Sequence, residues 1–137
     1  MLDLVDILVL NETELSAIAG AEIGESASDA HIVEAARTLQ RRDGQSVVVT
    51  LGRRGAVAWA QGKALTIPGK AVESRDPTGA GDCFVGAVAA QTALGVPIAP
   101  ALEYANVAAS ICVQRMGAGP SMPTAAEVAE NLRLPRG

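Results

Sequence analysis

The sequence predicts an α/β fold with a mixed sheet, and three observations lead to this prediction. Two short apolar runs, residues 5–10 and 46–51, are rich in β-branched side chains, as in strands of a buried parallel sheet. Between them, residues 28–42 place apolar side chains at helical spacing. After them, residues 55–60 and 63–68 are two shorter strand candidates, joined by a tight hairpin turn. The sheet is therefore expected to be parallel in its centre and antiparallel at one edge.

Two helices are expected among these strands. Residues 13–19 have helical character, and Gly20 follows them as a natural C-terminal cap. Residues 28–42 form an amphipathic helix with Ile32 and Leu39 on its apolar face and charged side chains on the other. Because a strand, a helix and a strand follow one another, the connection is a right-handed crossover between parallel strands. The second helix is expected to cover one face of the sheet.

The second half of the chain is expected to be helical. Residues 83–94 form an alanine-rich helix, and residues 99–116 are apolar on nearly every face. In a soluble protein, the latter pattern marks a helix that is buried between layers. Thr124 begins a last helix that continues to about Leu132, and Glu127, three residues after Thr124, completes a capping box.

The composition indicates one globular domain, residues 1–137. An apolar content of 49% over 137 residues is enough for one sizeable core. The formal net charge of −4 argues against a nucleic-acid partner, because such proteins normally carry a basic face. No run approaches the roughly 18 consecutive apolar residues of a membrane span, and no basic region precedes an apolar segment at the N-terminus. We therefore expect a cytoplasmic protein without nucleic-acid or membrane partners.

The cysteines and the single histidine give no sign of a metal site or a nucleophilic triad. Cys83 and Cys112 lie 29 positions apart with no second cysteine or histidine near either, which excludes the usual zinc spacings and a dense disulfide framework. We expect both to be reduced, buried thiols. His31 lies in a helical, polar-flanked stretch, which argues against a catalytic arrangement that depends on it.

The segment DPTGAGD, residues 76–82, lies between a strand and a long helix, and this arrangement builds an anion site. Gly79 and Gly81 let the backbone approach a ligand without a Cβ clash. The N–H groups of the first helical turn point at that ligand with the positive end of the helix dipole, so the loop suits phosphate. It is not a P-loop, because no Gly-Lys-Ser or Gly-Lys-Thr is present, and Phe84 stands where a dinucleotide fingerprint needs its third glycine.

Asp82 is the unusual residue of this segment, because a carboxylate beside an anion site repels the ligand. Its presence there makes chemical sense if it accepts a proton during the reaction. As a general base it would take the proton of an acceptor hydroxyl that attacks a γ-phosphoryl group, while the N–H groups of Ala80 and Gly81 stabilise the charge. Alternatively, Asp82 only complements the helix dipole and Asp76 only caps a turn. The residues taken alone leave both interpretations open.

The segment resembles the signature of the ribokinase-like (PfkB) carbohydrate kinases, in which an Asp, and a Thr two residues later, precede Gly-Ala-Gly-Asp. Three further segments occur in the order of that family. They are NETE at residues 11–14, similar to its Asn-x-x-Glu element; TLGRRG at residues 50–55, similar to its nucleotide loop; and residues 104–106 with 117–121, similar to its adenine and cation segment.

The resemblance implies ATP-dependent phosphorylation of a sugar hydroxyl. Asp82 would be the catalytic base, and the anion hole would consist of Gly79, Ala80 and Gly81. Asn11 would bind near the ATP phosphates, and Glu14 would organise Mg²⁺ through water, which suits an ion that keeps several waters. An ordinary N-cap with a capping-box glutamate is the alternative for Asn11 and Glu14, and both interpretations can hold at once.

The resemblance also implies further nucleotide contacts and a site for K⁺. Thr50, Gly52 and Gly55 would line the nucleotide, with Asn106 near the adenine or ribose. An Asn within an apolar helix needs a polar partner, which a protein group would satisfy equally well. The K⁺ ligands would be Asp76, the carbonyl groups of Thr78, Cys112, Arg115 and Gly117, and Ser121.

The resemblance covers almost the whole chain but only the C-terminal half, or slightly less, of a family member. The expected fold is therefore the C-terminal part of a three-layer α/β/α sandwich, with a mainly parallel sheet and an antiparallel edge hairpin. The first strand is expected to have an exposed or newly paired edge. A homodimer or a complementing N-terminal half are the partners that this implies, besides the sugar and ATP.

Ribose is the expected acceptor, because residues 106–123 look closest to the bacterial ribose-phosphorylating members of the family; fructose and a nucleoside are alternatives. The chain alone is expected to phosphorylate little or no sugar, because no segment supplies sugar contacts or a lid that excludes water. The rival class of function is a non-catalytic fragment that binds a nucleotide or is purely structural.

Overall fold

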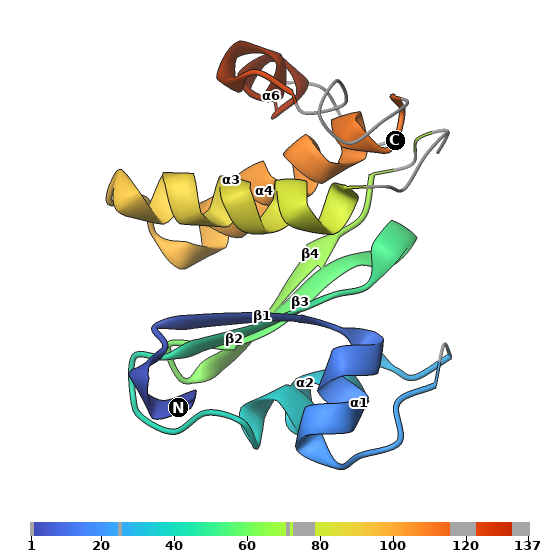
Figure 1. Ribbon diagram of the computed structural model, residues 1–137, viewed down its shortest axis with the longest axis vertical. Coiled ribbons are helices and arrows are strands. Elements are labelled where there is room, and N and C mark those ends of the chain that lie inside the picture. The colour runs from blue at the N-terminus through green and yellow to red at the C-terminus, as the bar shows by residue number, and fades with distance from the viewer. Residues whose placement is uncertain (1, 25, 71, 73–78, 116–122, 133–137) are drawn as a thin grey trace. The chain divides into compact units, whose positions relative to one another are not determined.

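A computed structural model describes residues 2–24, 26–70, 72, 79–115 and 123–132 of the chain (Figure 1). It divides the chain into two compact units, Met1–Pro68 and Gly69–Gly137, here called unit 1 and unit 2. Unit 1 contains a four-stranded sheet and two α-helices, and the described part of unit 2 is helical. None of the described helices is long and apolar enough to cross a membrane.

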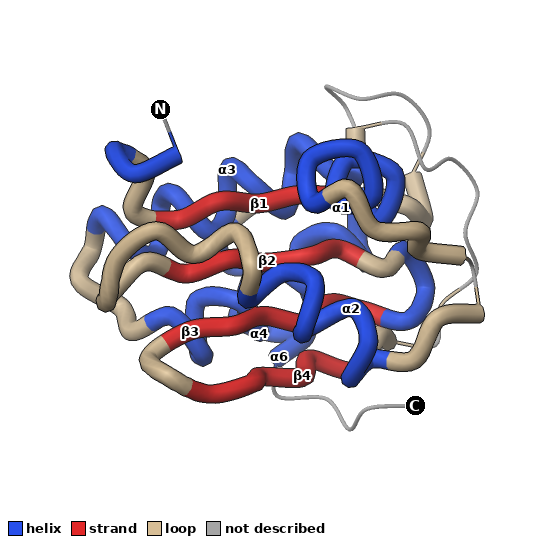
Figure 2. Tube along the Cα trace, turned by 90° about the horizontal axis from the view of Figure 1, so that it is seen from below, coloured by secondary structure: helices blue, strands red, loops and turns tan. Residues whose placement is uncertain are grey.

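The sheet of unit 1 has the strand order β1-β2-β3-β4, as Figure 2 shows. The strands are β1 (Ile7–Asn11), β2 (Ser46–Thr50), β3 (Gly55–Ala60) and β4 (Lys63–Pro68). β1 and β2 are parallel, and the pairs β2–β3 and β3–β4 are antiparallel, which confirms the predicted mixed sheet. Among the described strands, the parallel part is thus a single pair, and β1 forms one edge.

Two helices cover one face of this sheet (Figures 1 and 2). They are α1 (Glu12–Ala19) and α2 (Asp29–Arg37), and one-turn 3₁₀ helices occupy η1 (Leu2–Leu4) and η2 (Gly52–Arg54). The core between helices and sheet is aliphatic, because each element contributes small or branched side chains from its apolar face. Its fully buried members include Leu15, Ile32, Ala36, Val47, Val49 and Val57.

The prediction of a helix over residues 28–42 is wrong at its C-terminal end, since α2 ends at Arg37. The Thr38 hydroxyl donates to the carbonyl of Ala35 at 2.6 Å. The buried side chain of Gln45 then accepts a hydrogen bond from the Arg41 N–H at 2.8 Å, so a side chain replaces the helical partner. The amphipathic pattern continues through these residues although the helix does not.

The hairpin between β3 and β4 is confirmed. Ala60 pairs with Lys63 across the turn, and the two residues between them have positive φ, 53° for Gln61 and 73° for Gly62. Positive φ at both central positions is the requirement of the two-residue turn that matches the twist of antiparallel strands.

Unit 2 contains α3 (Ala80–Ala93), α4 (Ile98–Cys112) and α6 (Ala125–Leu132). α3 begins three residues before the predicted start at residue 83, and α4 ends at Cys112, before the predicted end at residue 116. Buried side chains from all three helices form the core of this unit: Cys83, Val107, Ala108, Ile111, Cys112 and Val128.

Candidate functional site

The carboxyl ends of the two parallel strands bring two of the predicted residues together. Asn11 ends β1, Thr50 ends β2, and the two are partners in the strand register. Thr50 Oγ1 also donates to the carbonyl oxygen of Leu10 at 3.4 Å. In α/β sheets, ligands bind beyond the carboxyl ends of parallel strands. Asn11 and Thr50 therefore lie where unit 1 would receive a ligand.

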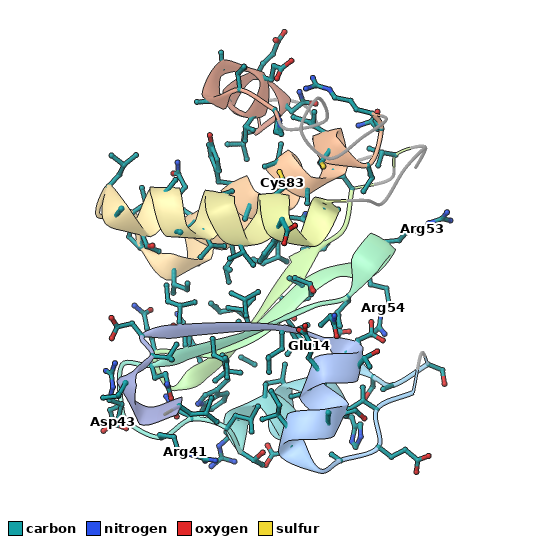
Figure 3. The ribbon with its side chains drawn as sticks, in the orientation of Figure 1. Glu14, Arg41, Asp43, Arg53, Arg54 and Cys83 are labelled. Atoms are coloured by element: carbon teal, nitrogen blue, oxygen red, sulfur yellow. The ribbon has the colours of Figure 1, made fainter. Side chains whose placement is uncertain are left out.

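Asn11 and Glu14 form the capping box of α1. The Asn11 Oδ1 accepts from the Glu14 N–H at 2.8 Å, and Glu14 Oε2 accepts from the Asn11 N–H at 2.9 Å. The cap uses the amide oxygen of Asn11 and one carboxylate oxygen of Glu14, so the amide NH₂ group and the second oxygen take no part in it. Both residues are exposed, and Figure 3 shows Glu14 at the N-terminal end of α1.

Glu14 suits a water-mediated magnesium contact. Mg²⁺ retains several waters and is commonly bound through one or two carboxylates. In the part of the chain that the structure describes, no group of three or more His, Cys, Asp or Glu side chains lies together as a metal cage. A single exposed carboxylate such as Glu14 fits an ion that is held partly through its waters.

The segment after β2 turns through two glycines with positive φ, 58° at Gly52 and 95° at Gly55. Such backbone conformations favour glycine over any residue with a Cβ. Between them, the guanidinium of Arg54 pairs with the carboxylate of Asp29 in the first turn of α2. Figure 3 shows Arg53 and Arg54 at the end of unit 1 where Glu14 lies. Thr50, Gly52, Asn11 and Glu14 thus belong to one end of the sheet.

In unit 2, the predicted anion hole lies at the start of α3. Gly79 is the N-cap residue in the left-handed conformation, with φ of 82°, and its carbonyl accepts the first helical bond from the Cys83 N–H at 2.8 Å. The N–H groups of Ala80, Gly81 and Asp82 precede that first bond, so no helical carbonyl lies within reach of them. No side chain of a described residue caps them. Free N–H groups at a helix N-terminus are the kind of group that an anion suits, so the anion hole stays a prediction.

The described part of unit 2 does not explain why residue 81 is a glycine. Its φ is not positive, so the backbone does not require glycine there. A Cβ placed on it would have no atom within 4 Å, so close packing does not require glycine either. Glycine also costs up to about 1 kcal/mol relative to alanine within a helix. Without a Cβ at residue 81, the backbone of the first turn of α3 stays accessible, although Gly86 in the same helix is equally free of both requirements.

Asp82 is the third residue of α3 and is exposed. It contributes to the lining of a pocket of about 260 Å³ between the three helices, whose other polar member is Tyr104. The remaining lining residues are small or apolar: Cys83, Gly86, Ala87, Ala90, Ala108, Pro123 and Val128. An acidic residue in the first turn complements the helix dipole. The position of Asp82 is compatible with both interpretations: a residue that complements the helix dipole, and a general base next to the predicted anion hole.

Cys83 and Cys112 form no disulfide and are buried, as expected. Burial raises the pKa of the Cys83 thiol to about 11, and the neighbouring thiol of Cys112 adds to the shift. A thiol with such a pKa is almost wholly protonated at neutral pH and is therefore a poor nucleophile. Cys83 follows Asp82 directly, but its chemistry is that of a core side chain.

Several residues of the implied K⁺ site cannot be placed. The described ones are Cys112 and Arg115. The carbonyl of Cys112 accepts the Arg115 N–H at 3.1 Å. Asn106, predicted near the adenine or ribose, is partly exposed in the middle of α4. Outside the described residues lie Asp76, Thr78, Gly117 and Ser121.

An ion pair that the sequence did not indicate links the end of α4 to α6. The two terminal guanidinium nitrogens of Arg115 donate to the carboxylate of Glu127, Nη2 at 2.6 Å and Nη1 at 3.3 Å. Glu127 also forms the predicted capping box with Thr124, whose N–H donates to Glu127 Oε2 at 2.6 Å. The hydrogen bonds from Arg115 and Thr124 lower the pKa of Glu127 to about 2, and the bond to Glu127 raises the pKa of Arg115.

Comparison with known proteins identifies the family. The model of the pfkB family carbohydrate kinases matches residues 1–125, so the chain belongs to this family. The ribokinase of Haemophilus influenzae is 33% identical over 132 residues, which cover 96% of this chain and 42% of that protein. The chain thus spans about two fifths of the length of that curated relative.

Solved structures show the same fold. The ribokinase of Arabidopsis thaliana, in complex with ribose and ATP, matches with a TM-score of 0.85 at 35% identity, over 98% of this chain and 43% of that one. A candidate ribokinase II of Escherichia coli, solved with ATP and Mg²⁺, matches with a TM-score of 0.76 at 31% identity, over 96% of this chain and 40% of that one. The predicted ribokinase-like α/β fold is thereby confirmed.

Proposed function

We propose that this chain is the nucleotide-binding and phosphoryl-transfer part of an ATP-dependent sugar kinase. The observation that carries the proposal is the N-terminus of α3, where no side chain of a described residue caps the first turn and where neither φ nor the packing of described residues requires Gly81. A phosphate group is the ligand that such a turn suits. Membership of the carbohydrate kinase family supports the same assignment.

In the proposed reaction, a sugar hydroxyl attacks the γ-phosphoryl group of ATP and ADP leaves. Asp82 accepts the proton of that hydroxyl, and the N–H groups of Gly79, Ala80 and Gly81 stabilise the charge on the transferring group. The N-terminus of a helix stabilises an anion through its N–H groups without helical partners and through its dipole. The proposed anion hole therefore does not require a positively charged side chain on α3. Catalysis of this kind depends on positioning and electrostatic stabilisation.

The residues at the end of the unit 1 sheet are proposed to hold the nucleotide. Asn11 donates its amide NH₂ group to the phosphates. Thr50, Gly52 and Gly55 line the nucleotide, with Asn106 near the adenine or ribose. Mg²⁺, held through water by Glu14, neutralises phosphate charge when bound. The carbonyls of Cys112 and Arg115 take part in a K⁺ site together with Asp76, Thr78, Gly117 and Ser121.

Ribose is the proposed acceptor, since the similar Arabidopsis protein was solved with ribose and ATP. Fructose or a nucleoside is the second candidate within the same chemistry. We further propose that sugar phosphorylation requires a complementing N-terminal half or a second copy of the chain, and that the protein acts in the cytoplasm. The 137-residue chain alone is expected to show little or no sugar phosphorylation.

A glycine substitution tests the proposed phosphate site. Gly81→Ala should leave the fold intact, because the added Cβ meets open space. It should weaken binding of MgATP, because the methyl group occupies the space that the phosphates need. Isothermal titration calorimetry of the chain measures the affinity, and denaturant unfolding measures the stability.

Gly86→Ala is the matched control. Gly86 lies in the same helix, also has no positive φ, and a Cβ there also meets open space. This variant should gain stability, by up to about 1 kcal/mol, without any loss of MgATP affinity. Unchanged affinity in Gly81→Ala, or no saturable MgATP binding by the unaltered chain, would contradict the proposed site.

A further inference from the structure

β1 is the outer strand on one side of the sheet in unit 1 (Figure 2), and its open side is here called the β1 edge. In a parallel pair, the N–H and C=O groups of one residue point to the same side of the strand, and the side alternates along the chain. The Ser46 N–H of β2 donates to the carbonyl of Asp6 at 3.0 Å, so Asp6 and every second residue after it point to β2. The backbone groups of Ile7, Val9 and Asn11 therefore point to the β1 edge.

The chain itself satisfies both ends of this edge. The Asn11 N–H donates to Glu14 Oε2 at 2.9 Å, and the carbonyl of Asn11, as that of an N-cap residue, accepts the first bond of α1. The Val5 N–H donates to the carbonyl of Leu2 at 3.3 Å, and the carbonyl of Val5 accepts from Gln45 Nε2 at 2.6 Å. The groups on either side of the middle of the edge are thus already bonded.

The middle of the β1 edge is open. In the part of the chain that the structure describes, no group hydrogen bonds to the outward N–H and C=O of Ile7 and Val9. Edge strands are usually guarded against pairing by a charge, a proline or a bulge. β1 reads ILVLN and contains neither a charged residue nor a proline, and residues 7–9 are partly exposed. Four backbone groups therefore await a partner strand.

We propose that a second copy of this chain binds the β1 edge, antiparallel, about a two-fold axis at Leu8. In an antiparallel pair, residue pairs that exchange two hydrogen bonds alternate with pairs that exchange none. With Leu8 opposite Leu8 of the second copy, Ile7 of each copy faces Val9 of the other and exchanges both bonds with it. All four open groups of each copy are then paired.

The few open groups also select this register. An axis at Val9 would place Ile7 opposite Asn11 of the second copy, and an axis at Ile7 would place Val9 opposite Val5, whose groups are already bonded. The edge thus matches itself fully with the axis at Leu8, as an isologous interface requires. Leu8 packs against the core under the helices, and the two Leu8 side chains would extend this apolar contact across the axis.

Sedimentation velocity of the 137-residue chain at a series of concentrations, without nucleotide, tests the proposal. The mass should rise from 13.9 kDa to twice that value, and reversibly, because one strand pair is a small interface. Hydrogen exchange followed by NMR is the second measurement. The amides of Ile7 and Val9 should exchange slowly in the dimer and fast after dilution, whereas the Leu8 amide, which points to β2, should exchange slowly in both.

A proline at the β1 edge tests the pairing itself. Val9→Pro removes an outward N–H and none that points to β2, a position where sheets tolerate proline. Because the axis repeats the change, two hydrogen bonds are lost per dimer, and the dissociation constant should rise by about tenfold or more. Hydrogen exchange of the unaltered chain keeps the proposal testable should this variant fold poorly.

Thr66→Pro is the matched control, at the opposite edge of the same sheet. Ala60 and Lys63 flank the two-residue turn and exchange hydrogen bonds, so by alternation the Thr66 N–H of β4 points away from β3. This variant removes one outward N–H, as Val9→Pro does, and should leave the dissociation constant unchanged.

Three results would overturn the proposal. The first is a monomer at every concentration, with fast exchange at Ile7 and Val9. The second is a dimer that keeps this fast exchange, or one that both proline variants weaken equally, because it would use another surface. The third is a longer polypeptide of the family that is monomeric and protects the same amides, because its own strand would then occupy the edge. Neither measurement involves a nucleotide, so failure here and failure of the proposed phosphate site are distinguishable.

Discussion

Asn11 combines a structural and a proposed functional contact in one side chain. Its Oδ1 caps α1, while its NH₂ group takes no part in the cap. The spacing of Asn11 and Glu14 allowed both a capping box and a nucleotide contact. The structure confirms the capping box, and the nucleotide contact stays a proposal. A carboxamide is one of the few side chains able to do both, because it carries an acceptor and a donor.

Substitution of Asn11 should separate the two contacts. Asn11→Ser keeps an N-cap of similar strength, so stability should change by only a few tenths of a kcal/mol, but it removes the amide donor and should weaken MgATP binding. Asn11→Ala should remove both the cap and the amide donor, so it should weaken MgATP binding and also lower the stability by about 1 kcal/mol. Denaturant unfolding and calorimetry measure the two effects. Undiminished MgATP affinity in Asn11→Ser would leave Asn11 as a cap alone.

At the residue scale, contacts between residues close in sequence were predictable and longer ones were not. The two capping boxes, Asn11 with Glu14 and Thr124 with Glu127, span three residues each and were visible in the sequence. The ion pair of Glu127 with Arg115 joins residues twelve apart across the end of one helix and the start of another. No pattern in the sequence fixes how such ends approach each other.

At the element scale, the strands and the hairpin followed from apolar runs and turn residues, whereas helix ends did not. The apolar periodicity of residues 28–42 continues past Arg37, but the Gln45 side chain takes the Arg41 N–H and the helix ends early. The order of the strands was also only partly predictable. The pattern indicated a parallel pair and a hairpin, and their register is set by packing between strands distant in sequence.

The ion pair at α6 makes the stability of unit 2 depend on pH. The folded pKa of Glu127, about 2, lies below its ordinary value of 4.5, so the unfolded chain binds this proton more readily. The stabilisation is therefore complete above about pH 4.5 and is lost as the pH falls towards 2. Glu127→Gln should lower the unfolding temperature at pH 7, and this difference should shrink as the pH falls.

The control for this prediction is Glu130→Gln, a change at an exposed position of the same helix. The difference in unfolding temperature between this variant and the unaltered chain should not shrink in the same way as the pH falls. Circular dichroism at a series of pH values between 7 and 3 measures both differences. A constant difference between Glu127→Gln and the unaltered chain over this range would mean that the pair does not stabilise the fold.

At the scale of the whole molecule, each of the two units contains residues with a proposed function. Unit 1 provides the end of the parallel strands with Asn11, Glu14 and Thr50, and unit 2 provides the start of α3. The family and its fold were predictable from short motifs, because glycine loops and helix N-termini are local features. That residues 1–137 form a single domain stays a prediction.

The residues of this chain say least about which sugar accepts the phosphoryl group. It spans about two fifths of the ribokinase of Haemophilus influenzae, and none of its described residues was assigned to the sugar. Selectivity among sugars depends on polar groups that match particular hydroxyls, because an unmatched buried polar group costs free energy. Assays of ribose, fructose and nucleosides therefore require a polypeptide that contains more of the family's length.

The central claim, that Asp82 is the base of a phosphoryl-transfer reaction, is tested most directly by Asp82→Asn in a longer or complemented protein that phosphorylates ribose. Phosphorylation should fall by about 10²- to 10⁴-fold, while MgATP affinity measured on the same preparation should largely persist. Asp43→Asn, an equal change of charge at an exposed loop position, should leave both unaltered. Undiminished turnover in Asp82→Asn would contradict the claim.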